Sequence, residues 1–256
     1  MACTRDSTAE DKGSIEYFDK LTKQHEETGY LRKTSNNTGW QMNVLDEFGE
    51  RFIQYAKACQ KPVILDLGVA YGYTSKQLLE AGASVVANEL SAEMLDDLLS
   101  NVSEEEKGRL QLKPGSALDL DFPAESFDGI LASRCFQFFK PDEMRSMLAR
   151  FAKWLRPGGK LCLTVSSPYL CKAIPFLDEY NRRRAAGVEF PGYFETAELE
   201  TILEGLKHMH FVDLDVLKRE VERAGFVVEK LAYIARPYAA NNGKEGVGVI
   251  CSKPKL

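Results

Sequence analysis

The feature that most constrains the fold is a short apolar run that ends in a glycine-containing turn. Residues 62–67 read Pro-Val-Ile-Leu-Asp-Leu, and residues 68–72 read Gly-Val-Ala-Tyr-Gly. An apolar run of this length, followed by a helical pattern over residues 73–81, predicts a buried strand, a tight turn and a helix. Such a strand needs cover on both faces, so the run indicates an α/β fold.

The same alternation of strands and helices continues through most of the chain. Ser91 is expected to cap the helix that follows the second strand. Residues 156–159, Arg-Pro-Gly-Gly, are expected to end the helix before the fifth strand. Alternation implies crossovers and a mostly parallel sheet, and the last two strands are expected to pair as a hairpin. The further strands are expected at 84–88, 110–112, 127–132, 160–165, 226–234 and 246–251, with helices at 91–100, 143–155 and 213–224.

The segments outside this alternation divide the rest of the chain. Residues 1–14 are small and polar and are expected to form a disordered tail. Residues 15–60 are expected to form an N-terminal helical lid, with Ser14 as the cap of its first helix. Residues 61–256 then form the main domain, with a cap insertion at 166–210. The second helix of the lid is expected to place five apolar residues on one face: Met42, Leu45, Phe48, Phe52 and Tyr55.

Composition limits the class of protein and its partners. The 256 residues include 33 Lys+Arg and 38 Asp+Glu, a net charge of −5, which disfavours nucleic acid as a partner. The N-terminus is polar and no run of about 18 apolar residues occurs, so neither a signal peptide nor a membrane span is expected, and the location is predicted to be cytoplasmic. Six cysteines without a Cys-x-x-Cys pair and only three histidines predict reduced thiols and no metal site.

The glycine turn and a later acidic residue indicate a ligand that contains a nucleoside. Gly68 and Gly72 let the backbone adopt positive φ and approach a ligand closely. Glu89 ends the second strand, 21 residues after Gly68, where a carboxylate can accept hydrogen bonds from both ribose hydroxyls. A dinucleotide fingerprint also needs glycines at the third and sixth positions, where Ala70 and Tyr73 stand instead. That pattern therefore fails.

Two later motifs give the chain a family resemblance. Residues 125–128, Glu-Ser-Phe-Asp, and residues 155–159, Leu-Arg-Pro-Gly-Gly, together with the glycine turn, resemble the class I S-adenosylmethionine-dependent methyltransferases. The chain is similar to the small-molecule enzymes that include the ubiquinone-biosynthesis, malonyl-carrier-protein and trans-aconitate methyltransferases. The resemblance covers about residues 61–167 and the later segment 223–226. It implies a Rossmann-like fold, S-adenosylmethionine as the cofactor and methyl transfer as the activity.

The resemblance also implies roles for single residues. Asp66 would orient the glycine turn or bind the amino group of the donor, and Gly68 would lie against its methionine and ribose. Glu89 would bind the ribose hydroxyls, and Leu90 would pack on one face of adenine. Ser133 would contact the methionine end. The full set of expected donor-binding residues is Asp66, Gly68, Gly72, Glu89, Leu90, Ser116, Ala117 and Ser133.

Two positions depart from the family pattern. Ala70 stands where the family usually has a glycine, and alanine is tolerable there if its φ is negative. Ser116 stands where many members have an aspartate that bonds the adenine amino group. The backbone N–H of Ala117 is a second candidate for the adenine ring. Loss of one adenine hydrogen bond weakens binding by roughly 1 kcal/mol, so neither departure predicts an inactive site.

The acceptor is less well defined by the sequence. The segment at 133–139 usually faces the acceptor, and it lacks the Asn/Asp-Pro-Pro-Tyr/Phe motif of enzymes that methylate nucleobase amino groups. Its Phe136-Gln137-Phe138 stretch is similar to that of carboxyl-methylating members, although these aromatic residues could instead fill the core. Lys172 and the run Arg182-Arg183-Arg184 are hypothesised to meet an anionic acceptor, with a solvated helix face as the alternative.

The cap insertion offers candidates for a general base, and the lid offers candidates for a contact with the ligand. His208 or His210 is a candidate general base, with a structural role as the alternative, and no catalytic residue is assigned. Tyr30 or Trp40 of the lid is expected to reach the ligand. The predicted function is methyl transfer to a small acceptor at oxygen, with an anionic acceptor as a hypothesis. The alternatives are an RNA or protein methyltransferase and a non-catalytic S-adenosylmethionine-binding protein. The sequence leaves the oligomeric state open.

Overall fold

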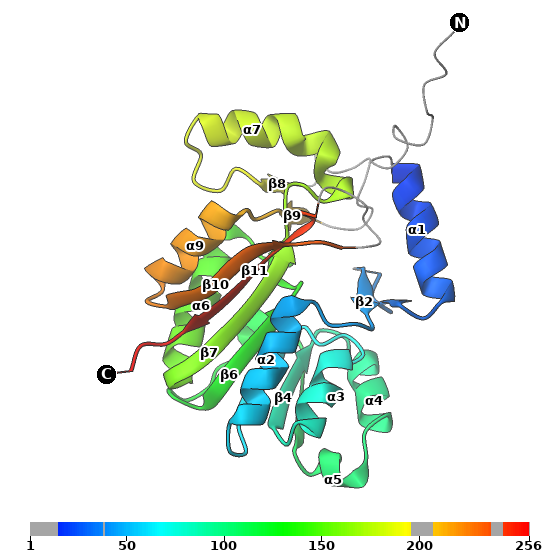
Figure 1. The fold of residues 1–256 in the computed structure, drawn as a ribbon, viewed down its shortest axis with the longest axis vertical. Helices are drawn as coiled ribbons and strands as arrows, with labels where there is room; N and C mark the ends of the chain where they lie inside the picture. The colour runs from blue at the N-terminus through cyan, green and yellow to red at the C-terminus, as the bar shows by residue number, and fades with distance from the viewer. Residues whose placement is uncertain (1–14, 38, 196–206, 237–242, 256) are drawn as a thin grey trace, which may run out of the picture.

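The main feature of the computed structural model is a seven-stranded sheet in the order β10-β11-β7-β6-β3-β4-β5 (Figure 1). The structure describes residues 15–37, 39–195, 207–236 and 243–255. β3, β4, β5, β6 and β7 are parallel, whereas β11 is antiparallel to both of its neighbours, β7 and β10. The predicted α/β fold with a terminal antiparallel strand is confirmed. The strands are β3 (Val63–Leu67), β4 (Ser84–Glu89), β5 (Leu110–Pro114), β6 (Phe127–Ser133), β7 (Leu155–Ser166), β10 (Val227–Ile234) and β11 (Gly246–Ser252).

Helices cover both faces of this sheet and form two separate cores. Alternate residues of β3 show the division, because Ile64 packs with one core while Leu65 and Leu67 pack with the other. The core of Ile64 includes α2 (Glu47–Ala58), α3 (Tyr73–Glu80) and α4 (Ala92–Ser100). The core of Leu65 includes α6 (Pro141–Trp154) and α9 (Leu214–Arg223). The short α5 (Glu104–Lys107) leads into β5.

Three local predictions differ from the structure. The helix α2 begins at Glu47 because Asp46 accepts a hydrogen bond from the N–H of Gly49 at 2.9 Å, so the prediction that Met42 and Leu45 belong to this helix is wrong. The helix α6 begins at Pro141, two residues before the predicted start, because proline suits the first helical position. Ser91 lies at the N-cap position of α4 but makes no capping bond, and its Oγ is 3.3 Å from Ser35 Oγ.

A hairpin and the insertion at 166–210 lie beside the carboxyl edge of the sheet (Figure 1). The segment 15–60 is not wholly helical, since β1 (Leu31–Lys33) and β2 (Trp40–Met42) form an antiparallel hairpin after α1 (Ile15–Glu27). The proposed cap Ser14 lies outside the described residues. The insertion contains a second hairpin as well as helices. Its elements are a 3-10 segment at Cys171–Phe176, α7 (Leu177–Ala185), β8 (Tyr193–Glu195) and β9 (His208–His210).

A third core joins the first hairpin to the insertion. Leu31 and Met42 of the hairpin pack in one buried cluster with Tyr180, Phe194 and Met209 of the insertion. Two segments that are distant in the sequence therefore meet above the carboxyl ends of the strands. Among the described residues, no helix is long and apolar enough to cross a membrane, and no group of three or more His, Cys, Asp or Glu side chains could hold a metal ion.

Candidate active site

A cavity of about 550 Å³ lies at the carboxyl ends of the parallel strands, where open α/β sheets bind their ligands. The hairpin β1–β2 and the insertion contribute part of its wall. Its volume is in the range of small-molecule sites. Of the predicted donor-binding residues, all but Gly72 line this cavity: Asp66, Gly68, Glu89, Leu90, Ser116, Ala117 and Ser133.

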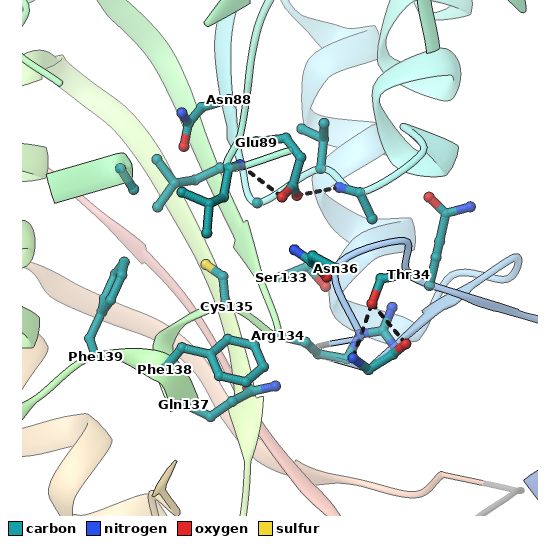
Figure 2. Close-up of a pocket in the computed structure, with 18 of the residues that line it drawn as sticks. Thr34, Asn36, Asn88, Glu89, Ser133, Arg134, Cys135, Gln137, Phe138 and Phe139 are labelled. Atoms are coloured by element: carbon teal, nitrogen blue, oxygen red, sulfur yellow. Dashed lines mark hydrogen bonds between the residues drawn. The ribbon is translucent and has the colours of Figure 1, made fainter. Parts of the chain in front are cut away.

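Glu89, at the end of β4, is held between two backbone segments. Its Oε2 accepts a hydrogen bond from the N–H of Ala70 at 2.9 Å, and its Oε1 accepts one from the N–H of Leu90 at 2.8 Å. Figure 2 shows both bonds as dashed lines that meet at the carboxylate. The side chain is 7% exposed. Backbone donors that a side-chain substitution cannot remove therefore fix this carboxylate at the cavity wall.

Asp66, at the carboxyl end of β3, is buried close to a second carboxylate. The pKa of Asp66 is raised to about 7, mainly by burial; the charge of Glu89 also raises it, and the hydrogen bond from Ser75 Oγ at 2.6 Å lowers it. The pKa therefore lies near neutral pH, where small changes in the surroundings decide the charge of the group. A cation in the cavity would favour the ionised form.

Gly68 and Gly72 both have positive φ, at +70° and +76°, but they serve different purposes. A Cβ at Gly68 would lie 2.8 Å from Cys135 Cβ, at the cavity wall. A Cβ at Gly72 would lie 2.4 Å from a methyl carbon of Leu98 in α4. The second glycine thus lets α3 and α4 pack closely, and the structure does not place it at the cavity.

Ala70 has φ +49°, so the condition under which an alanine would be tolerable here, a negative φ, is not met. The left-handed region costs a non-glycine residue about 1–2 kcal/mol. A glycine avoids this cost, but it loses about 0.5–1 kcal/mol more conformational entropy than alanine when the chain folds.

We expect Ala70→Gly to raise the free energy of unfolding by up to about 1 kcal/mol, measured by urea denaturation. Ala58→Gly, at an exposed helical position, is the matched control and should lower it by up to about 1 kcal/mol. A loss of stability in Ala70→Gly would contradict the prediction.

The walls on the β4 and β5 side offer an apolar surface and several polar groups. Leu90 is 64% exposed, which is unusual for a leucine, and it lines the cavity. Ser116 Oγ accepts a hydrogen bond from the N–H of Leu118 at 3.2 Å, which leaves its other lone pair and its proton available. Asn88 donates from Nδ2 to the carbonyl oxygens of Lys113 and Gly115, and this fixes the end of β5.

The segment after β6 forms the opposite wall (Figure 2). Ser133 Oγ lies 3.2 Å from Thr164 Oγ1, and Arg134 has φ +55°, a strained backbone next to the cavity. Burial raises the pKa of the Cys135 thiol, as do the carboxylates of Asp66 and Glu89, so this cysteine stays protonated. In the Phe-Gln-Phe stretch, Phe136 is buried core, whereas Gln137 and Phe138 line the cavity.

The hairpin β1–β2 lines the cavity with several residues that the sequence did not indicate as ligand contacts. Trp40 does line it, as expected, but Tyr30 does not. The other cavity residues of this region are Thr34, Asn36, Gly39, Gln41 and Met42. They lie too far from the glycine turn in the sequence for spacing to indicate them.

Arg32 connects this hairpin to the glycine turn and to α4. Its guanidinium lies 3.4 Å from the centre of the Tyr71 ring and donates to both carboxylate oxygens of Asp97, at 2.8 and 2.9 Å. The hydroxyl of Tyr71 donates to the carbonyl of Lys33 at 3.0 Å. These contacts hold the cavity residues of the hairpin against the turn.

Removal of the Arg32 charge should therefore loosen the hairpin. A surface ion pair and a cation–π contact together contribute about 1 kcal/mol, so Arg32→Met should weaken binding of a ligand that the hairpin covers about fivefold. The measurement is calorimetric titration with S-adenosylhomocysteine. Arg51→Met removes an exposed arginine that pairs with Glu47 outside the cavity and is the matched control. Equal affinity in both variants would show that the hairpin does not depend on Arg32.

The structure tests the hypothesis that arginines of the insertion meet an anionic acceptor. The anion hypothesis for residues 182–184 is wrong, because none of the three lines the cavity; Arg182 and Arg183 donate to Glu179, and Arg184 to Asp215. The side chain of Lys172 lies outside the described residues.

The two histidines of β9 differ in their surroundings. His210 is buried away from the cavity, where burial lowers its pKa to about 4, so it stays neutral. His208 lines the cavity, and its Nε2 lies 2.9 Å from the carbonyl oxygen of Phe138. A carbonyl only accepts, so in the neutral ring the proton would lie on Nε2 and the lone pair on Nδ1.

Comparison with known proteins shows what the chain is similar to. The family model described as a methyltransferase domain matches residues 64–159. An uncharacterized methyltransferase of Geobacillus kaustophilus is 27% identical over 64% of this chain and 68% of its own length. These matches support a class I S-adenosylmethionine-dependent methyltransferase. The resemblance expected from the sequence is confirmed, and the cofactor of this family is S-adenosylmethionine.

Other relatives show how far the likeness extends. An uncharacterized methyltransferase of Anoxybacillus flavithermus is 30% identical over 39% of this chain, and the match spans only 44% of that relative's length. A solved structure of the 1,6-didemethyltoxoflavin-N1-methyltransferase of Burkholderia thailandensis, with 1,6-didemethyltoxoflavin and S-adenosylhomocysteine bound, superposes with a TM-score of 0.61 at 17% identity. The superposition covers 100% of this chain and 92% of the Burkholderia chain. At this identity the likeness establishes the fold alone.

Proposed function

We propose that this methyltransferase binds S-adenosylmethionine at the carboxyl ends of β3, β4 and β5 and transfers its methyl group to a small acceptor. The observation that carries the proposal is that one cavity of about 550 Å³ collects all the residues expected to bind the donor except Gly72. The polar groups suit it: Glu89 presents a fixed carboxylate for ribose hydroxyls, and Leu90 offers an exposed apolar side chain for a flat base. Ser116 and the N–H of Ala117 would serve the adenine edge.

The methionine end would lie between the ends of β3 and β6. Asp66 would pair there with the cationic part of the donor, Gly68 would leave room for its backbone approach, and Ser133 would offer a hydroxyl. When bound, the donor supplies a methyl group on a sulfonium, which is already a good leaving group. The protein then contributes mainly by holding the acceptor in line and by excluding water.

We infer that the acceptor is a small molecule methylated at oxygen. Among the described residues, the cavity wall carries three carboxylates, Asp66, Glu89 and Glu143, against two guanidinium groups, which disfavours a polyanion such as RNA. A carboxylate acceptor needs no base, whereas for a hydroxyl acceptor His208 is the candidate base, because its Nδ1 lone pair is available. The predicted cytoplasmic location stays a prediction.

Two measurements test this proposal in sequence. Calorimetric titration with S-adenosylhomocysteine should give saturable binding at one site per chain, and loss of that binding in Glu89→Gln would locate it at this cavity. Transfer of labelled methyl from S-adenosylmethionine to a panel of small phenols and carboxylic acids should then give O-methyl products. A chain that binds donor and methylates no member of a broad panel would support the non-catalytic alternative instead.

A further inference from the structure

Arg236 presents an unsatisfied charged group to the same cavity. It follows the carboxyl end of β10, is only 6% exposed and lines the cavity. Its Nη1 donates to Ser166 Oγ at 3.2 Å, and its backbone N–H donates to the buried carboxylate of Glu245 at 3.0 Å. Its Nη2 is buried and has no hydrogen-bond partner among the described residues. A buried guanidinium nitrogen without a partner is costly, and native proteins seldom leave one unless a ligand or water completes it.

The neighbouring strands give this side chain a defined place. Gly246 of β11 pairs with Ser166 of β7, and a Cβ at Gly246 would lie 3.0 Å from Nη2 of Arg236. The guanidinium therefore crosses over β11 at its glycine and reaches the end of β7. Any larger residue at position 246 would displace it. The fold thus brings a cation from one edge of the sheet to the cavity in its middle.

A second buried group without a partner lies on the same cavity. Gln137, in the segment after β6, is 7% exposed, and its Oε1 has no hydrogen-bond partner among the described side chains and backbone. Because an amide presents both a donor and an acceptor, Gln137 can bond a hydroxyl or a carboxyl group. Apolar side chains of Phe138 and Phe211 also line the cavity. An arginine, an amide and aromatic surface together suit a small aromatic or aliphatic acid.

Strand spacing gives the size of such a ligand. β6, which ends at Ser133, is the neighbour of β7, and β3, which leads to Gly68, is the next strand. Neighbouring strands lie about 4.8 Å apart, so the guanidinium at the end of β7 is on the order of 5–10 Å from the proposed methionine site. This is the length of a small molecule with its anionic group at one end and its reacting group at the other.

We propose that Arg236 binds the carboxylate of the methyl acceptor, with Gln137 bonding a second polar group of the same molecule. This rests on the proposed donor site and names the acceptor class of that site: small monocarboxylic acids of aromatic or similar apolar character. A guanidinium offers a carboxylate two parallel N–H donors, a geometry that neutral isosteres do not match. The carboxylate would complete the hydrogen bonding of Nη2 and neutralise the charge of Arg236.

The test uses the full chain saturated with S-adenosylhomocysteine. Benzoate, phenylacetate and 3-phenylpropionate are titrated at millimolar concentrations, each beside its neutral carboxamide, with binding followed by calorimetry or ligand-observed NMR. At least one acid should bind about tenfold more tightly than its amide, since a charge-assisted hydrogen bond is lost in the amide. Equal binding of acids and amides, or no binding of any acid, would overturn the proposal. This comparison needs no variant, so it stands even if substitution of Arg236 prevents folding.

Variants then locate the effect. Arg236→Met should abolish the preference for acid over amide, and Arg236→Lys should restore only part of it. Arg182→Met removes an exposed arginine that does not line the cavity and should keep the full preference. A preference that survives in Arg236→Met overturns the assignment to this residue. The first titration, with S-adenosylhomocysteine alone, separates the two proposals: if wild type does not bind it, the donor site fails, whereas loss of acid preference alone overturns only the acceptor proposal.

Discussion

Glu89→Gln is expected to weaken S-adenosylhomocysteine binding about 100-fold, the largest effect we expect from a single substitution at the site. A hydrogen bond to a charged group contributes about 1.5–3 kcal/mol, and the carboxylate would accept from both ribose hydroxyls. Glutamine keeps the size of the side chain but offers one acceptor, and its amide group faces the backbone donors of Ala70 and Leu90. The measurement is calorimetric titration of the variant and of wild type under the same conditions.

Because Glu89 also holds the glycine turn, Glu89→Gln could weaken binding by displacing the turn. A control must therefore separate this effect from the loss of the ribose contacts. A titration with an analogue of S-adenosylhomocysteine that lacks the ribose 2′-hydroxyl provides it. Wild type should lose affinity for this analogue, whereas Glu89→Gln should bind analogue and parent almost equally, as expected for two groups in direct contact. Glu93→Gln changes an exposed acid of α4 outside the cavity and should bind like wild type. Equal losses for the analogue in both proteins would place the ribose elsewhere.

The sheet was predictable because its pattern is local and repeated. Apolar runs such as 63–67 and 160–165 form stable strands only when both of their faces are buried. The helices between these strands act as crossovers, so few sheet topologies are possible. The hairpin β1–β2 was missed for the opposite reason. Its strands have three residues each and its stability comes from packing with Met209 and Phe194, more than 150 positions away, which no local pattern reveals.

The site was predictable where one motif holds several of its residues, and not where distant segments meet. Glu89 and the glycine turn are related by a fixed spacing, so the sequence indicated both. Arg236 has no such signal: a single arginine after a strand acquires meaning only because Gly246 lets it cross β11. Arg182 to Arg184 show the converse. A run of like charges is conspicuous in a sequence, yet nearby acids such as Glu179 and Asp215 pair with these arginines on the surface.

Asp66→Asn is expected to weaken S-adenosylhomocysteine binding between about 10-fold and 100-fold at pH 8, because a charged partner of the ligand's amino group becomes neutral. The pH dependence gives the sharper test. The pKa of Asp66 is raised to about 7, so below that pH the group is mainly protonated and above it mainly ionised. The cationic end of the ligand favours the ionised form, and the affinity of wild type should therefore rise several-fold between pH 6 and pH 7.5, values on either side of this pKa.

Two variants assign that rise to Asp66. Asp66→Asn should remove it. Ser75→Ala should move it to higher pH, because the hydrogen bond from Ser75 to Asp66 at 2.6 Å favours the ionised carboxylate and its loss raises the pKa further. The direction of this shift decides between two roles of Asp66. If the carboxylate only supported the fold, Ser75→Ala would lower the stability of the protein without changing the pH dependence of ligand binding. An unmoved profile in Ser75→Ala would therefore show that Asp66 does not face the ligand's charge.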